Sequence, residues 1–267
     1  MTTNSDVQIV AAGYDLVHAA VEQSPTFDRI WREGALGADF PDGFEHISFA
    51  DLDELRAVVA ALRLDAGSAL VDLACGLGGP GLWVARETGA ALTGIDVSMS
   101  AVEGSRRRAE RLGLADRARF ATGTFAATGL DDGAFDGAMS FDALQYAPDK
   151  QAAFDEAARI LRPGGRIAFA CFELNPERVA GLPVLSADPV ADYAPLLERA
   201  GFDVSAYDET PDWRGRVTRT YQALADARPA LAAEMGEAAC NALLGEVTLT
   251  LQVQPYGRRV FVAATRR

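Results

Sequence analysis

Two aspartates of this chain stand where two predicted strands meet a cluster of glycines. Asp72 lies inside the apolar run 69–74, and Asp96 closes a second apolar run, 91–95. The chain just after the first run is rich in glycine, with Gly76, Gly78, Gly79 and Gly81. A glycine turn between a strand and a helix presents backbone N–H groups to a nucleotide-like ligand, because no side chain blocks its approach. The pattern therefore predicts a ligand of that kind at this turn.

The positions of the two carboxylates narrow the chemistry of the ligand. Asp96 follows Gly76 by 20 residues, a spacing at which a carboxylate accepts both hydroxyl hydrogens of a ribose. Asp72 precedes the turn, where its charge would repel a pyrophosphate and attract an ammonium or a sulfonium. The fit of Gly76, Gly78 and Gly81 to the pattern G-x-G-x-x-G nevertheless leaves an NAD-dependent oxidoreductase open as an alternative.

The order of the predicted elements supplies a scaffold for these side chains. Strand patterns alternate with helical ones, and the strands are expected at 69–74, 91–96, 118–121, 136–141, 166–172, 202–207 and 260–264. Such alternation predicts an α/β fold with a doubly wound, mostly parallel sheet. Because ligands of these folds bind beyond the carboxyl ends of the strands, we expect Asp72, Asp96 and Asp142 to face one crevice.

Helical patterns precede the predicted sheet and also interrupt it. Residues 1–65 are expected to form an N-terminal helical cap, and Asp51 with Glu54 three residues later is a typical helix start. Residues 188–200 predict another helix. We expect a single domain, divided into the cap 1–65, a cofactor-binding core 66–210 and 257–267, and a helical substrate lid 211–256.

Composition limits the partners of the protein. The formal net charge of −13 disfavours nucleic acid, because phosphate backbones would be repelled. The three cysteines and two histidines show no metal-ligand spacing, so no metal is expected. The first residues are polar, and no uncharged apolar run reaches the ~18 residues of a membrane span. We therefore expect a cytoplasmic monomer or homodimer that binds a small molecule and no membrane.

Four stretches, in order, resemble the motif series of the class I S-adenosylmethionine-dependent methyltransferases of small-molecule type. They are VDLACGLG at 71–78, GIDVS at 94–98, the segment 135–144, and LRPGGR at 161–166. The resemblance implies a seven-stranded Rossmann-like sheet whose last strand is antiparallel. It also implies S-adenosylmethionine as cofactor and methyl transfer to an O, N or C atom of a small molecule, such as a specialised metabolite. A methyltransferase-like protein without methyl transfer is a further alternative.

Carried over by position, the resemblance implies roles for residues around the crevice. The backbone at Ala74, Gly76 and Gly78 would approach the methionine part of the cofactor. Asp72 would orient its amino group, Asp96 would hold its ribose, and Val97 would pack on its adenine. Thr124 stands where the family often has an acidic residue. The other residues expected at the cofactor are Tyr14, Phe125, Phe141 and Asp142.

The sequence does not assign a catalytic residue. Displacement at an activated sulfonium depends mainly on the orientation of the two reactants, so it requires little from any one side chain. An O- or C-acceptor would still gain from a general base. The candidates for that base are His18, His46, Tyr146 and Asp142. Aromatic and arginine side chains of the cap and lid are the expected substrate contacts, namely Trp31, Phe49, Tyr146, Trp213 and Arg216.

Overall fold

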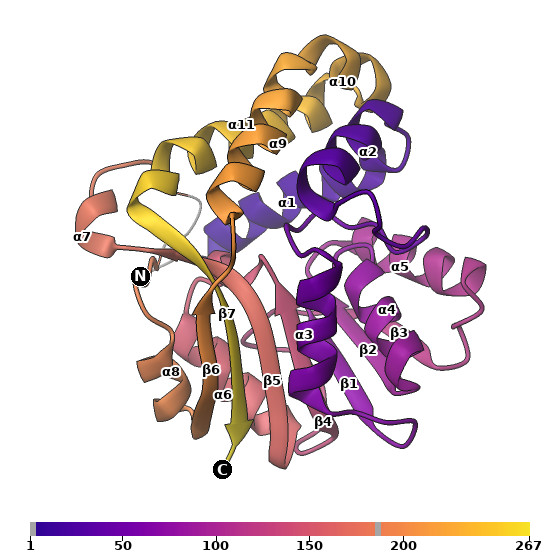
Figure 1. Ribbon diagram of the computed structural model, residues 1–267, viewed down its shortest axis with the longest axis vertical. Helices are drawn as coiled ribbons and strands as arrows, with labels where there is room; N and C mark the ends of the chain where they lie inside the picture. Colours follow the sequence, from indigo (N-terminus) through magenta and orange to yellow (C-terminus); the bar gives the residue numbers. More distant parts are fainter. Residues whose placement is uncertain (1–3, 185–187) are drawn as a thin grey trace.

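The strands of the computed structural model form one seven-stranded sheet in the order β3-β2-β1-β4-β5-β7-β6 (Figure 1). The structure describes residues 4–184 and 188–267, with side chains from residue 12 onward. The strands are β1 (Ala69–Leu73), β2 (Ala91–Asp96), β3 (Ala118–Thr122), β4 (Phe135–Phe141), β5 (Leu161–Leu174), β6 (Phe202–Glu209) and β7 (Gly257–Arg266). β7 pairs antiparallel with both neighbours, and the pairs among β1 to β5 are parallel. The predicted fold class is therefore confirmed.

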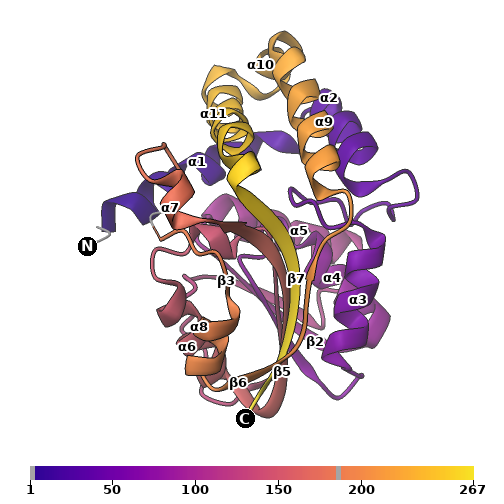
Figure 2. The ribbon, with the colours of Figure 1, turned by 60° about the vertical axis from the view of Figure 1, so that its left-hand side comes forward.

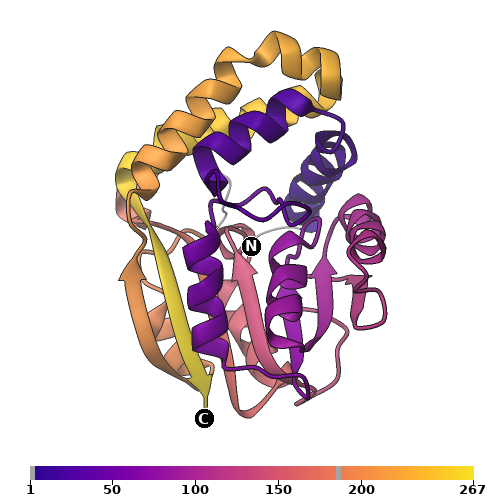
Figure 3. The same cartoon turned by 45° about the vertical axis from the view of Figure 1, so that its right-hand side comes forward.

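Helices cover both faces of the sheet and its upper edge. They are α1 (Asn4–Val21), α2 (Pro25–Trp31), α3 (Leu52–Leu62), α4 (Gly79–Thr88), α5 (Met99–Arg111), α6 (Lys150–Ile160), α7 (Pro176–Val179), α8 (Ala194–Arg199), α9 (Trp213–Asp226), α10 (Arg228–Met235) and α11 (Glu237–Val253), with short turns η1 (Arg32–Leu36), η2 (Leu144–Tyr146) and η3 (Gln254–Tyr256). α3, α4 and α5 lie on one face, and α6 and α8 lie on the other (Figure 2). α1, α2 and α9 to α11 lie together above the carboxyl ends of the central strands (Figure 3).

Side chains predicted to start helices do so. Asp51 and Glu54 form a reciprocal capping box at α3, and Ser98 and Asp149 cap α5 and α6 by accepting backbone N–H groups. Pro80 lies in the first turn of α4, where its missing N–H has no partner to lose.

Two boundaries differ from the prediction by five residues or more. The helix expected at 188–200 is only α8, Ala194–Arg199, and it begins with a proline in its first turn. β5 begins at Leu161 rather than at residue 166, because Leu161 pairs with Phe135 across an irregular register at the start of β4. Neither difference moves a residue of the predicted crevice.

The hydrophobic core joins the cap and lid to the sheet. One cluster of buried side chains runs from α3, α4 and α5 into α2, α9 and α11, and includes Trp31, Phe49, Leu55, Trp213 and Tyr221. A second cluster fills the space between the sheet and α6 and α8, with Phe154, Phe169 and Leu197. Because the first cluster is continuous, the helices above the sheet are held to it by packing as well as by chain connection. No helix in the described part of the chain is long and apolar enough to cross a membrane.

Candidate active site

A cavity of about 340 Å³ lies at the carboxyl ends of β1, β2 and β4, under α1. The crevice predicted for Asp72, Asp96 and Asp142 is this cavity, since all three line it. So do the other expected cofactor residues Tyr14, Ala74, Gly76, Val97, Thr124, Phe125 and Phe141. Gly78 is the exception among them: its N–H donates to the Cys75 carbonyl at 2.8 Å, and a Cβ there would come within 2.9 Å of the Ser105 hydroxyl. Gly78 thus determines the shape of the turn without lining the cavity.

The glycine turn owes its form to positive φ angles and to Asp96. Ala74, Gly76 and Gly78 have φ of +59°, +52° and +78°, and an alanine in that region stores strain. The Gly76 N–H donates to Asp96 Oδ2 at 2.8 Å, and the Ser98 N–H donates to Asp96 Oδ1 at 2.9 Å. Asp96 therefore ties the turn after β1 to the end of β2, and each oxygen keeps a lone pair for a ligand hydroxyl.

Asp72 is a buried acid beneath the turn, with 3% of its surface exposed. A Cβ on Gly81 would lie 2.6 Å from Asp72 Oδ2, so only glycine fits there. Burial, with the charge of Asp96, raises the pKa of Asp72 to about 8, although the Gly81 backbone favours the charged form. A positive ligand group would relieve both penalties. The floor of the cavity thus suits a cation that also carries ribose hydroxyls, which fits an adenosyl sulfonium.

An acid that sequence reasoning missed lies behind the upper lining of the cavity, which we call the roof. This acid, Glu246, contacts Tyr14 and Tyr146 of the lining but is not itself a lining residue. Among the described side chains, those of Tyr14, Tyr146 and Tyr221 donate hydroxyl hydrogen bonds to Glu246, at 2.9, 3.1 and 3.2 Å. Desolvation raises the pKa of Glu246, and the three hydroxyls oppose that rise. A signal was available in the sequence, because Glu246 is the one charged residue between Glu237 and Arg258 in an apolar helix.

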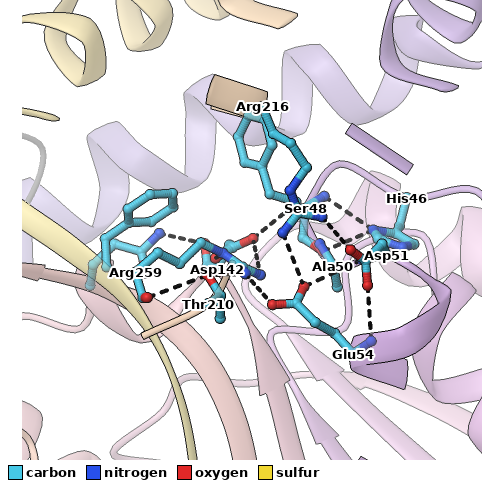
Figure 4. A network of polar contacts seen from close by, with 12 residues as sticks. His46, Ser48, Ala50, Asp51, Glu54, Asp142, Thr210, Arg216 and Arg259 are labelled. Carbon is cyan, nitrogen blue, oxygen red and sulfur yellow. Dashed lines mark hydrogen bonds and ion pairs between the residues drawn. The ribbon is translucent and has the colours of Figure 1, made fainter. Parts of the chain in front are cut away.

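A buried ion-pair network joins this roof to the sheet (Figure 4). Arg259 of β7 has 0% of its side chain exposed and donates to Asp142, with Nε 2.7 Å from Oδ1. It also pairs with Glu54 of α3. The Phe49 N–H donates to Asp142 Oδ2 at 2.7 Å. Both carboxylate oxygens of Asp142 are therefore occupied, which makes this residue a poor general base. Sequence reasoning missed Arg259 because its partner is 117 positions away.

The two histidines are buried at the edge of the cavity, and each has one ring nitrogen without a partner among the described residues. Burial lowers the pKa of His18, opposed by Asp96 and Asp15. Burial, then Arg108 and Arg259, lowers the pKa of His46 to about 3. The Ser48 N–H points at His46 Nδ1 at 3.2 Å, so the proton of this neutral ring sits on Nε2. The unprotonated nitrogen of His46, Nδ1, is thus already occupied, which makes this residue a poor general base.

The expected substrate contacts separate into two groups. Tyr146 lines the cofactor cavity, whereas Trp31, Phe49, Trp213 and Arg216 are not among its lining residues. Trp31 and Phe49 pack on each other with ring centroids 5.1 Å apart, as part of the core. Arg216 pairs with Asp51 at 2.6 Å and so serves the ion-pair network. Trp213 lines a smaller cavity under the lid, which we call the lid cavity, together with Tyr146, Phe172, Tyr221, Leu249 and Val253.

No group of His, Cys, Asp and Glu side chains within the described ranges could hold a metal ion.

Comparison with known proteins shows what this part of the chain is similar to. Residues 71–169, which contain the motif stretches of β1, β2, β4 and β5, match the family model described as a methyltransferase domain. Methyltransferase GfsG of Streptomyces halstedii is 33% identical over 154 residues, which are 54% of this chain and 55% of that protein. The 27-O-demethylrifamycin SV methyltransferase of Amycolatopsis mediterranei is 29% identical over 221 residues, 76% of this chain and 79% of that protein.

A solved structure shows the same fold over nearly the whole length. The [4+2]-cyclase SpnF superimposes with a TM-score of 0.74 at 23% identity, covering 96% of this chain and 94% of SpnF. The chain spans only about half the length of GfsG. The family match covers the glycine turn and both strand-end carboxylates, so residues 71–169 are similar to a methyltransferase domain, and the cofactor that this similarity supports is S-adenosylmethionine.

Proposed function

We propose that this protein transfers the methyl group of S-adenosylmethionine to a small-molecule acceptor of specialised metabolism, in the cytoplasm and without nucleic acid, as a monomer or homodimer. The observation that carries the proposal is the floor of the cavity. Asp72 and Asp96 lie beside one glycine turn, both buried, with Asp72 held at a raised pKa that a cation would lower. A pyrophosphate would meet two acids there, which disfavours the NAD alternative.

In this proposal the chain's own residues bind and orient the cofactor. The backbone at Ala74 and Gly76 approaches its methionine part, Asp72 faces its ammonium, and Asp96 accepts hydrogen bonds from its ribose. Val97, Thr124 and Phe125 enclose the adenine, and Tyr14 covers the crevice. When bound, the cofactor supplies a methyl group already activated on sulfur, so the protein mainly aligns the acceptor and excludes water.

The acceptor is proposed to lie between the cap, 1–65, and the lid, 211–256, over the cofactor-binding core. Two observations support this placement. Tyr146 lines the cofactor cavity and the lid cavity, and the lid cavity is otherwise mostly apolar. The relatives' names also support a small natural product, since one is a demethylrifamycin methyltransferase.

The fold neighbour SpnF favours a second candidate, because it is named a [4+2]-cyclase. A protein of this fold could therefore bind the cofactor and act on a small molecule without methyl transfer. The two candidates share the cavity floor and differ in what happens to the methyl group.

Calorimetry followed by product analysis tests the proposal. S-adenosylmethionine and its demethylated product should bind, and NAD should not. The protein is then incubated with cofactor labelled at the methyl group and a pool of candidate metabolites, and products are identified by mass spectrometry. Transfer of label supports the proposal. Cofactor binding with a converted but unlabelled metabolite favours the second candidate, and NAD binding would overturn both.

A further inference from the structure

The roof of the cavity holds a carboxylate that the proposed function does not use. We call Tyr14, Tyr146, Tyr221 and Glu246 the tyrosine cluster. Its members come from α1, η2, α9 and α11, so four elements converge on one acid. An apolar side chain of similar size would hold these helices together without the cost of burying a charge. The presence of a carboxylate at this position is therefore better explained by a chemical role than by packing.

We propose that Tyr146 and Glu246 accept the proton of the acceptor molecule, which is an apolar compound that carries its methyl-accepting hydroxyl group at Tyr146. This inference rests on the proposed methyl transfer and names its acceptor class. It assigns Tyr146 as the group that touches the acceptor and Glu246 as the group that receives the proton through it.

The placement of Tyr146 is the first support. Among the described residues, Tyr146 alone lines both the cofactor cavity and the lid cavity. An acceptor with an apolar group in the lid cavity would therefore hold a neighbouring hydroxyl at Tyr146, on the side of the cofactor cavity. The hydroxyl of Tyr146 donates to Glu246 Oε1 at 3.1 Å, and its oxygen also faces the Tyr14 hydroxyl and the Gln145 amide, whose place the acceptor hydroxyl would take.

The lining of the lid cavity is the second support. The cavity measures about 50 Å³, so it holds a small apolar group of the acceptor next to the reacting hydroxyl. Phe172, Trp213, Leu249 and Val253 are among its walls. Glu173 also lines it, but this acid is paired with Arg258 and with the Tyr207 hydroxyl. The walls thus offer an apolar molecule contact and offer few polar groups that are not already bonded.

The proton balance favours a hydroxyl over an amine. In the proposed step the acceptor oxygen bonds to the methyl carbon, and the S–CH₃ bond breaks with its electron pair passing to sulfur. The O–H bond of the acceptor breaks, its proton passes to Tyr146 Oη, and the Tyr146 proton passes to Glu246. The products are a methyl ether, S-adenosylhomocysteine and protonated Glu246, which later loses its proton to solvent. An amine beside a buried carboxylate would instead be held as its unreactive ammonium.

The groups that face Glu246 suit it to this task. They are the hydroxyls of Tyr14, Tyr146 and Tyr221, with the charge of Asp142 behind them. Desolvation raises the pKa of Glu246, which strengthens it as a proton acceptor near neutral pH. Asp142 itself is paired with Arg259 and is occupied.

A pair of matched probes tests the inference without turnover. The complex with S-adenosylhomocysteine is titrated with 4-nitrophenol and with its methyl ether, 4-nitroanisole, below the pKa of the free phenol. The phenol is expected to bind about tenfold or more tightly than the ether, as one charge-assisted hydrogen bond predicts. In Tyr146→Phe and in Glu246→Gln this preference should fall below about threefold. Bound phenol should also show the absorbance of its phenolate in the native protein and not in Glu246→Gln.

A control variant separates this role from a structural one. Tyr193→Phe removes another buried tyrosine hydroxyl, which donates to the Phe172 carbonyl at 3.0 Å and lines none of these cavities. It should keep the preference for the phenol. Equal affinity for the two probes, failure of the phenol to bind, or an unchanged preference in Tyr146→Phe would each overturn the inference.

The same experiment is independent of the proposed function. If labelled methyl transfer occurs but the phenol is not preferred, only the inference about Tyr146 and Glu246 fails. If no acceptor is methylated, the proposed function fails whatever the probes show. Once an acceptor is identified, Tyr146→Phe should lower kcat by about 100-fold while the KM for the cofactor changes little. A merely structural role would instead lower the Tm and the cofactor affinity.

Discussion

The floor and the roof of the cavity are built in opposite ways. On the floor, partners are near in the chain or on adjacent strands, as when Gly76 donates to Asp96 20 positions away. In the roof, Tyr14 and Glu246 meet across 232 positions, and Tyr146 and Glu246 across 100. The floor relies on backbone groups and glycines, whereas the roof relies on side chains from four elements. This difference separates a half of the site that short-range contacts build from a half that only long-range contacts build.

Substitutions in the floor and in the roof are therefore expected to affect different properties of the protein. A floor residue supports the shape of one turn, so its substitution is expected to weaken cofactor binding. A roof residue holds distant segments together, so its substitution is expected to lower the free energy of unfolding or to change which acceptor binds. Three predictions test this division.

The largest loss of stability is expected on substitution of Arg259, the residue of β7 that connects the buried ion-pair network to the sheet. Arg259→Met leaves Asp142 and Glu54 buried without their shared partner, although the volume is similar. The free energy of unfolding should fall by about 3–5 kcal/mol, because uncompensated buried charges are costly. Chemical denaturation measures it.

The exposed pair Arg267–Asp203 provides the control for this variant. Arg267→Ala should cost less than about 1 kcal/mol, because solvent screens the pair. Equal losses in the two variants would show that the buried network does not join roof to floor.

Much of the fold and the cavity floor could be predicted from sequence, for a physical reason. Strand patterns, caps at Asp51, Ser98 and Asp149, and the glycine turn are local signals, and local signals are visible in a single sequence. The parallel sheet then brings strand ends together, so Asp72 and Asp96 were expected to meet before any contact was known.

The roof could not be predicted in the same way. Arg216 and Arg259 look alike in sequence as exposed charges, and only packing shows that each is an ion-pair partner inside the molecule. Trp31 and Phe49 carry the same aromatic signal as Trp213, yet they line neither the cofactor cavity nor the lid cavity. Pairings over 100 positions or more leave no local pattern.

An intermediate effect is expected at Asp96 on the floor. Asp96→Ala removes an acceptor of the Gly76 and Ser98 N–H groups and the proposed partner of the ribose. The affinity for S-adenosylmethionine should weaken by about 1–3 kcal/mol, as loss of charged hydrogen bonds predicts. Calorimetry measures it, and Asp203→Ala on the outer strand serves as the control. Unchanged affinity would remove Asp96 from the floor.

The smallest effect, and the one that distinguishes floor from roof most directly, is the pH response of Asp72. Its folded pKa is about 8, above the value of about 4 expected in the unfolded chain. Between these values the folded protein holds a proton that the unfolded chain has lost. Without cofactor, the free energy of unfolding should therefore fall as pH rises, by about 1 kcal/mol between about pH 6 and pH 7 from this group.

Cofactor binding should show the opposite slope with pH, because a cation beside Asp72 lowers its pKa and expels the proton. The affinity for S-adenosylmethionine should rise toward about pH 8 and then level off. Asp72→Asn cannot titrate, so both slopes should diminish in it, while Glu246→Gln in the roof should leave the cofactor slope in place. If Asp72→Asn kept the cofactor slope and Glu246→Gln abolished it, the cation would be recognised by the roof, and the division between the two halves of the cavity would be reversed.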